Sequence, residues 1–125
     1  DEDAEFLPRM YKSTNCVVYT GSHDADCSAT WIKNVEGDAK KRFKVECLDK
    51  TSYKGVYAMI HLALSSVANL SIIPIQDYLC LTNEEGRMNT PSIAYGNWTY
   101  RLSNRYCTNK LKEKIKEITI LTNRD

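Results

Sequence analysis

Two segments of the chain carry side chains that can bind or polarise hydroxyl groups. The first is the run SHDAD, which places His23, Asp24 and Asp26 directly after a short apolar segment. A second group follows later in the sequence, and its members are Gln76, Asp77, Arg87, Asn89, Asn97 and Trp98. Carboxylates and amides can satisfy paired hydroxyls, while an indole covers the apolar face of a sugar ring. These residue types therefore suit a neutral polyhydroxyl ligand.

Several of these residues also have a simpler interpretation. Asp24 or Asp26 can cap the helix that follows, which typically stabilises a protein by about 1 kcal/mol. Together with His23 they can also ligate a divalent ion, but the spacing HDxD supplies neither a closed zinc set nor a calcium-binding loop. Trp98 can equally be a core or interface aromatic. We therefore expect no metal, while capping and catalysis both stay open for Asp24.

Two short apolar segments are predicted to form strands. Residues 16–20, CVVYT, are mostly β-branched or aromatic, too short for a helix, and followed by Gly21. Residues 71–75, SIIPI, have the same character, with Pro74 near the end and Gln76 and Asp77 just beyond. Each predicted strand therefore leads directly into one of the two polar groups.

The segment between these strands contains the clearest helix. From residue 52 to residue 70, apolar side chains recur at intervals of three and four residues, as on one face of an amphipathic helix. These side chains are Val56, Met59, Ile60, Ala63, Leu64, Val67 and Ala68. His61 falls on the polar side, and we interpret it as an ordinary surface histidine. Strand, helix and strand together predict a βαβ unit with parallel strands.

The rest of the chain is predicted to contain further helices and one long loop. Residues 29–47 form one or two helices interrupted near Gly37, and residues 109–121 form an amphipathic helix. Residues 83–97 are rich in Gly, Asn, Pro and Ser, which is typical of a functional or disordered loop. Functional groups in parallel α/β folds collect beyond the carboxyl ends of strands. We therefore expect His23 and Asp24 to face the same cleft as Asn89.

Length and charge exclude several functional classes. At 125 residues the chain holds at most half of a closed (β/α)₈ barrel, which needs about 250 residues. The 17 Lys and Arg and 16 Asp and Glu give a net charge of +1, spread along the chain, so nucleic acid is not an expected partner. No apolar run approaches the roughly 20 residues of a membrane span, so a membrane is not expected either.

The ends and the cysteines suggest where the protein works. The acidic start DEDAEF is unlike a signal peptide, and from the start at Asp1 we expect a chain that begins inside a longer protein, with processing as the alternative. The five cysteines are odd in number and far apart, and no two form a CxxC pair. A disulfide framework would leave one thiol unpaired, so we expect reduced thiols in a cytoplasmic protein, with a plastid as the lesser alternative.

Three segments, in the right order, resemble the 4-α-glucanotransferase family, also called amylomaltases or disproportionating enzymes. They are CVVYTGSHDAD at residues 16–26, HLALSSVANLSIIPIQDYLCL at residues 61–81 and EGRMNTPSIAYGNWTYRL at residues 85–102. The strings RMNTP and GNW are unusual, which makes the third match specific. The first segment departs from the family pattern at Ser22, Ala25 and Cys27 but keeps His23 and Asp24.

This resemblance implies an α/β fold in which residues 1–125 are the C-terminal portion of a (β/α)₈ TIM-type barrel. The portion covers about strands 7 and 8 with their helices, without a separate second domain. The resemblance also implies retaining glycosyl transfer by a nucleophilic Asp, an acid/base Glu and a third Asp that stabilises the transition state. Asp24 matches the third of these. His23 matches a hydroxyl-binding residue, Asn89 and Trp98 are candidate substrate contacts, and Arg87 orders the loop.

The resemblance further implies that the substrate is an α-1,4-glucan or maltooligosaccharide, handled without a cofactor. A retaining enzyme needs two carboxyl groups about 5 to 5.5 Å apart, and only one has a counterpart here. The isolated chain is therefore expected to be inactive. We expect it to partner the remainder of the barrel or a second copy of itself, because unpaired strand edges favour pairing. The alternative hypothesis is a noncatalytic glucan-binding or assembly module.

Overall fold

A computed structural model describes residues 4–125, so the expectation drawn from Asp1 falls outside the described part. Two short strands, β1 (Val17–Tyr19) and β2 (Leu70–Ile72), pair in parallel with Val18 opposite Ser71. Within residues 4–125 they make up a single two-stranded sheet. The parallel pairing predicted from the two apolar segments is confirmed.

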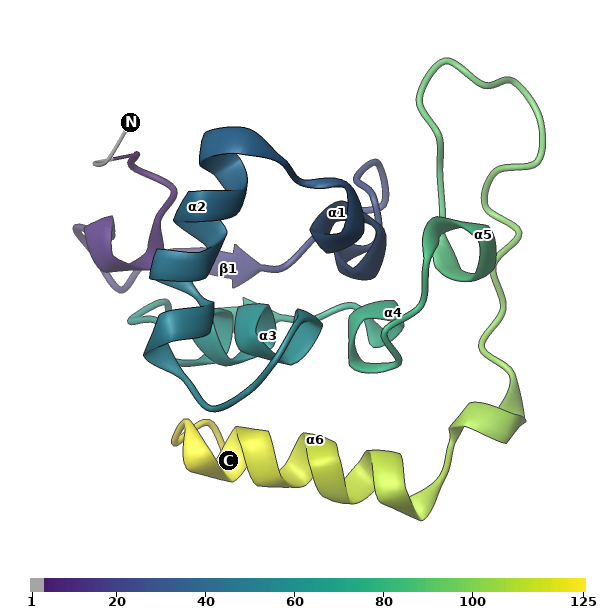
Figure 1. Ribbon diagram of the computed structural model, residues 1–125. Coiled ribbons are helices and arrows are strands. Elements are labelled where there is room, and N and C mark those ends of the chain that lie inside the picture. Colours follow the sequence, from purple (N-terminus) through teal and green to yellow (C-terminus); the bar gives the residue numbers. More distant parts are fainter. Residues whose placement is uncertain (1–3) are drawn as a thin grey trace.

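Helices pack on one face of this small sheet and beyond its end, and leave its other face bare (Figure 1). In chain order they are α1 (Ser28–Asn34), α2 (Gly37–Glu46), α3 (Val56–Leu64), α4 (Ile75–Tyr78), α5 (Asn83–Gly86) and α6 (Asn109–Leu121), with short 3₁₀ turns at Pro8–Met10, Leu48–Lys50 and Asn104–Tyr106. In Figure 1, α6 runs below α3, while α1, α4 and α5 lie toward the end to which β1 points. The segment after α5 makes a wide excursion before it reaches α6.

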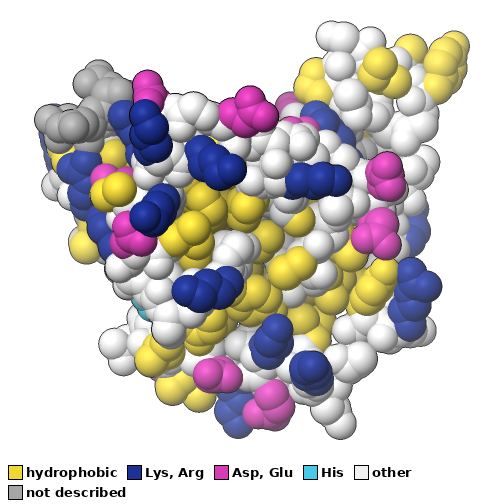
Figure 2. Space-filling model, in the orientation of Figure 1, with side chains coloured by type: hydrophobic (Ala, Val, Ile, Leu, Met, Phe, Trp, Pro, Cys, Tyr) yellow, Lys and Arg dark blue, Asp and Glu magenta, His cyan; other side chains and the backbone are white. Residues whose placement is uncertain are grey.

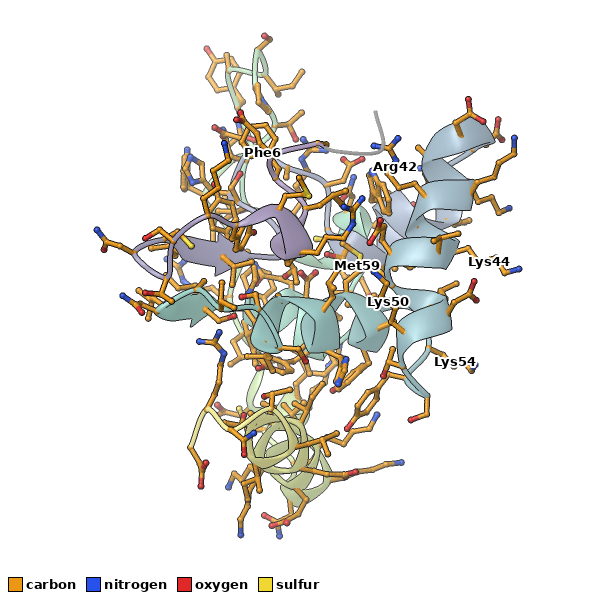
Figure 3. All side chains as sticks on the ribbon, turned by 90° about the vertical axis from the view of Figure 1, so that its left-hand side faces the viewer. Phe6, Arg42, Lys44, Lys50, Lys54 and Met59 are labelled. Atoms are coloured by element: carbon orange, nitrogen blue, oxygen red, sulfur yellow. The ribbon has the colours of Figure 1, made fainter. Side chains whose placement is uncertain are left out.

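The core forms around α3, whose apolar residues recur with the period of a helix. Ile60 is fully buried and packs with Val56, Leu64 and, from α6, the fully buried Ile118. A second cluster joins α3 to the inward side chain of β1, and a third joins it to α2. Figure 3 shows Met59 of α3 pointing toward α2. The helix thus holds the sheet, α2 and α6 together.

The central helix is shorter than the predicted span of residues 52–70. It begins after Gly55, which adopts a positive φ of 54°, and it ends at Leu64. The carbonyl oxygen of its last residue, Leu64, accepts from far along the chain, because the Arg124 guanidinium donates to it and to the carbonyl oxygens of Ser66 and Ala68 in the turn that follows. The apolar periodicity continues past the true end, and Val67 is 55% exposed there. Side-chain spacing alone could not reveal this distant cap.

The second strand was also predicted with the wrong bounds. It covers Leu70–Ile72 rather than residues 71–75, and Pro74 is the N-cap of α4. The proline ring fixes φ near the value that a helix start accepts, so the chain turns into a helix there instead of continuing the strand. Gln76 and Asp77 consequently lie on α4 and do not directly follow a strand.

The remaining predictions agree more closely with the structure. Residues 29–47 contain two helices, and α2 starts at Gly37, which has a positive φ of 59°. Helix α6 has the predicted bounds, and the long loop starts with the single turn α5. All five cysteines are free thiols. Among the described residues, no helix is long and apolar enough to cross a membrane.

One face of the sheet carries exposed apolar side chains. Val17 pairs with Leu70 and Tyr19 with Ile72, and these four side chains are 49–59% exposed. Alternate side chains of a strand point to opposite faces, so all four share one face while Val18 packs inward. Figure 2 shows a further band of hydrophobic side chains framed by Lys and Arg. The described residues therefore leave much apolar surface in contact with water.

Candidate functional site

The site lies at the carboxyl end of β1, where residues 21–27 connect the strand to α1. This connection carries His23 and Asp24, whose side chains are 56% and 51% exposed. His23 Nε2 lies 3.3 Å from Asp24 Oδ2. Both groups can therefore reach a ligand.

A second segment, which follows α5, packs directly against this connection. Asn89 Nδ2 donates a hydrogen bond to Asp24 Oδ1 at 2.6 Å, and Asn89 N donates to the carbonyl oxygen of His23 at 3.1 Å. An amide that donates to a carboxylate makes a charge-assisted hydrogen bond, which is stronger than a neutral one. His23, Asp24 and Asn89 thus lie together, as expected. The expectation that all three face one cleft is not confirmed, because only His23 of the three lines the pocket described below.

Arg87 links the same two segments through its whole guanidinium group. Its Nη1 donates to Asp26 Oδ1, its Nη2 to the carbonyl oxygen of Asp24 at 3.1 Å, and its Nε to the carbonyl oxygen of Asn89 at 2.8 Å. A planar fork of donors in fixed geometry is suited to such simultaneous bonding. Arg87 thereby sets the distance between Asp24 and Asn89.

Trp98 completes the cluster from the far end of the long loop. Its ring centroid lies 5.1 Å from that of His23, and its side chain is 56% exposed. Its backbone adopts a positive φ of 60°, which is uncommon for a residue with a side chain, and its N–H donates to the carbonyl oxygen of Met88 at 2.7 Å. Strain of this kind concentrates at functional sites. Asn97, by contrast, bonds to Thr90 and Ile93 within the loop.

A pocket of about 190 Å³ opens between the two segments. Its lining includes His23, Asp26, Gln76, Asp77, Arg87 and Met88. Asp24, Asn89 and Trp98 are not part of this lining and lie next to it through their contacts with His23. Ligand sites typically enclose about 300–1,000 Å³, so the pocket has the size of part of a site.

The three aspartates near the pocket differ in how their oxygens are engaged. Asp26 accepts from Asn83 and Arg87, and Asp77 is 2% exposed and accepts from Thr20 and Ser28. Among the three, Asp24 has the most exposed side chain, 51% against 39% for Asp26, and it contacts His23 and Asn89. Its carboxylate is therefore the most accessible of this group.

The structural alternatives for Asp24 and Asp26 find no support in the geometry. The first N–H groups of α1 are bonded by Asn83, which accepts from Cys27 N, and by Asp77, which accepts from Ser28 N. These distant side chains do the capping. A metal site at these residues is not supported by the geometry either. Asp26 already forms an ion pair with Arg87, and within residues 4–125 no three His, Cys, Asp or Glu side chains lie close enough together to hold a metal ion.

Cys27 lines the pocket but is not placed to act as a nucleophile. Burial, and next the negative charge of Asp77, raise the pKa of its thiol above the usual value. A thiol with a raised pKa stays protonated near neutral pH and reacts poorly. His61 does not line the pocket; it is half-buried against Tyr53, and burial lowers its pKa.

The family model described as 4-alpha-glucanotransferase matches residues 1–108 of the chain. The chain belongs to this 4-alpha-glucanotransferase family. The 4-alpha-glucanotransferase of Clostridium butyricum is 38% identical over 120 residues, which are 95% of this chain and 24% of the relative. That of Synechocystis sp. is 40% identical over 102 residues, 81% of this chain and 20% of the relative. The chain thus spans about a quarter to a fifth of the curated relatives it matches.

A solved 4-alpha-glucanotransferase supports the same assignment in three dimensions. The amylomaltase from Streptococcus agalactiae, determined in complex with acarbose, matches the chain with a TM-score of 0.87 at 25% identity. The match covers 98% of this chain and 24% of that chain. The mixed helix and strand fold of residues 4–125 is therefore the fold of part of an amylomaltase.

Some residues that build this part of the glucanotransferase were not recognised in the sequence. Thr20, Ser28 and Asn83 hold the ends of the connection through hydrogen bonds, and nothing in their spacing indicates it. Asp77 had a usable signal, because it is a charged residue within the largely apolar run SIIPIQDYLCL. A carboxylate among apolar neighbours is rarely buried without partners.

Proposed function

We propose that this chain is the part of a 4-alpha-glucanotransferase that supplies one catalytic carboxylate and a share of the sugar site. The observation that carries the proposal is the hydrogen bond between Asn89 Nδ2 and Asp24 Oδ1. It joins the two segments that match the family motifs and sets both side chains beside the His23 imidazole. The substrate is an α-1,4-glucan or maltooligosaccharide, and no cofactor takes part.

In the proposed fold, residues 1–125 are the C-terminal portion of a (β/α)₈ barrel, about strands 7 and 8 with their helices and no second domain. Two parallel strands with intervening helices support this placement. Active sites of such barrels lie at the carboxyl ends of the strands, which is where Asp24 is located.

In the proposed mechanism, Asp24 binds hydroxyls of the reacting sugar and stabilises the positive charge that develops on its ring. A fixed carboxylate favours that charge without reorganising at the moment of reaction. Asn89 fixes the orientation of the carboxylate, His23 binds a hydroxyl, and Trp98 covers an apolar sugar face. The nucleophile and the acid/base belong to the remainder of the protein, because retention needs two further carboxyl groups close together.

The solved amylomaltase in complex with acarbose supports a carbohydrate ligand for this site. The five free thiols support a reducing, cytoplasmic location, which is also part of the proposal. A noncatalytic glucan-binding module is the alternative outcome, and the experiment below separates it from the enzyme.

The test is to incubate the full-length protein that contains this chain with maltotriose and to separate the products. Transfer predicts glucose together with maltooligosaccharides longer than maltotriose. Residues 1–125 alone should give neither product. Glucan binding without turnover by the full-length protein would favour the binding module, and transfer by the isolated chain would contradict the proposed division of carboxylates.

A further inference from the structure

Asp77 is the most completely buried charged side chain near the site, with 2% of its surface exposed. Its carboxylate accepts three hydrogen bonds. Thr20 Oγ1 and Ser28 Oγ both donate to Oδ2, the latter at 2.8 Å, and Ser28 N donates to Oδ1 at 3.1 Å. A buried carboxylate is tolerated only with partners of this kind, so its three bonds are tightly coupled to the local fold.

The three bonds reach both ends of the connection that carries the proposed catalytic group. Thr20 is the residue that follows β1, and Ser28 is the first residue of α1. His23 and Asp24 lie between them, on residues 21–27, which contain no helix or strand. The Asp77 side chain thus bonds both ends of this connection to α4.

The residue beside Asp77 performs a similar task for the other segment. Gln76 Nε2 donates to the carbonyl oxygen of Gly86 at 3.1 Å, just before Arg87 and Asn89. A Cβ at Gly86 would meet the side chains of Gln76 and Leu81 at 3.0 Å, so a larger residue there would require these neighbours to move. Helix α4 therefore carries side chains that bond to both segments of the site, Asp77 to the first and Gln76 to the second.

We propose that Asp77 is a positioning residue for the glucanotransferase site, acting through Thr20 and Ser28 to fix where His23 and Asp24 lie. Asp77 lines the pocket, but both of its carboxylate oxygens are engaged by Thr20 and Ser28, so it acts on the site through these two residues. This inference rests on the proposed function and deepens it. A shift of about 1 Å in a catalytic group can cost about 100-fold in rate, so a loose connection would impair catalysis without removing any contact to the substrate.

The test uses the full-length protein with Thr20→Val, which keeps the branched shape and removes the hydroxyl that bonds Asp77. The matched control is Thr119→Val, which removes a comparable half-buried hydroxyl bond, from Thr119 Oγ1 to the carbonyl oxygen of Ile115 in α6. Titration calorimetry with acarbose gives the dissociation constant and the number of competent sites separately. Maltotriose turnover is measured in parallel, and unfolding midpoints show how much each variant is destabilised.

We expect Thr20→Val to weaken acarbose binding and to lower kcat, each by about tenfold, at unchanged stoichiometry. Thr119→Val should leave both values unchanged. A purely structural role for Asp77 would instead lower the stoichiometry or the midpoint at an unchanged dissociation constant, and that result would overturn the inference.

Asp77→Asn is the second variant, because it keeps the shape and removes the charge that accepts from Thr20 and Ser28. It should weaken acarbose binding at least as much as Thr20→Val does. Wild-type affinity in both variants would reject Asp77 as a positioning residue while leaving the proposed function intact. A wild-type protein that neither binds acarbose nor turns over maltotriose would overturn the proposed function itself, and this inference with it.

Discussion

Asp24 owes its orientation to side chains that are more than sixty positions away in the sequence. Asn89 donates to its carboxylate, and Arg87 donates to its carbonyl oxygen and to the neighbouring Asp26. Such long-range bonds hold two irregular segments in one geometry without help from a strand or a long helix. The reacting group is therefore only as well placed as the contacts between the two segments allow.

Replacing Arg87 by lysine should loosen these contacts. Lysine keeps the positive charge but cannot bond Asp26 and the carbonyl oxygens of Asp24 and Asn89 together. We expect the full-length protein to lose about 1–3 kcal/mol of unfolding free energy in urea. Arg101→Lys is the control, since Arg101 is exposed and donates to the adjacent Tyr100 carbonyl. Equal midpoints for the two variants would show that the guanidinium fork is not needed.

At this scale the sequence predicted the residue types better than their partners. His23, Asp24 and Asn89 were recognisable because they belong to motifs and follow predicted strands. Asp77 was placed just beyond the end of a predicted strand and proved to be a buried residue of α4, because Pro74 starts a helix where the apolar pattern continues as a strand. Hydrogen bonds across fifty or more residues leave no trace in local spacing.

The site is formed by short elements, while the longer helices α3 and α6 form the core that packs beside them. Helix α3 provides the main core, and α6 closes it with Ile118, which is fully buried. Removing a buried side chain loses transfer free energy and leaves a cavity. The stability of this support therefore depends on how closely α6 packs against α3.

The change Ile118→Ala should lower the unfolding free energy of the full-length protein by about 2–5 kcal/mol. Ile120→Ala, on the same helix but 49% exposed, is the matched control and should change it much less. Denaturant unfolding of both variants gives the comparison. Similar losses for the two would mean that α6 does not pack on α3 through this face.

Among the elements, strong periodicity was the reliable guide. Helix α6 was predicted with its true bounds because its apolar face, its N-terminal Thr108 cap and its end coincide. Helix α3 was predicted too long, since the turn after Leu64 keeps an apolar pattern and its carbonyls are bonded by Arg124. Helix boundaries that depend on tertiary contacts therefore could not be predicted from local sequence patterns.

The whole molecule leaves one apolar face of its sheet exposed to water. Within residues 4–125 the sheet has two strands, and the exposed face carries Val17, Tyr19, Leu70 and Ile72. Soluble proteins seldom expose large contiguous apolar patches, and strand edges without partners recruit other chains. A chain that spans about a quarter of its relatives is expected to present such surfaces, because the rest of the protein would cover them.

Residues 1–125 prepared alone should therefore self-associate. Sedimentation velocity at micromolar concentration is expected to show dimers or larger species, and Tyr19→Lys with Ile72→Lys should shift them toward the monomer by charging the exposed face. The outer face of α2 offers the control, because Lys44→Ala changes an exposed side chain that projects outward in Figure 3. A stable monomer of the unmodified chain would contradict the need for a cover.

The most direct test of the glucan-transfer account is the maltotriose turnover of the full-length protein with Asp24→Asn, measured beside its unfolding midpoint. The account predicts a fall in kcat of about 100- to 1,000-fold, because the change removes the charge that stabilises the transition state, while the unfolding midpoint falls no further than in Arg87→Lys. Asp38→Asn, an exposed carboxylate on α2, should keep full turnover. Near-normal turnover by Asp24→Asn would remove this carboxylate from the reaction and contradict the account.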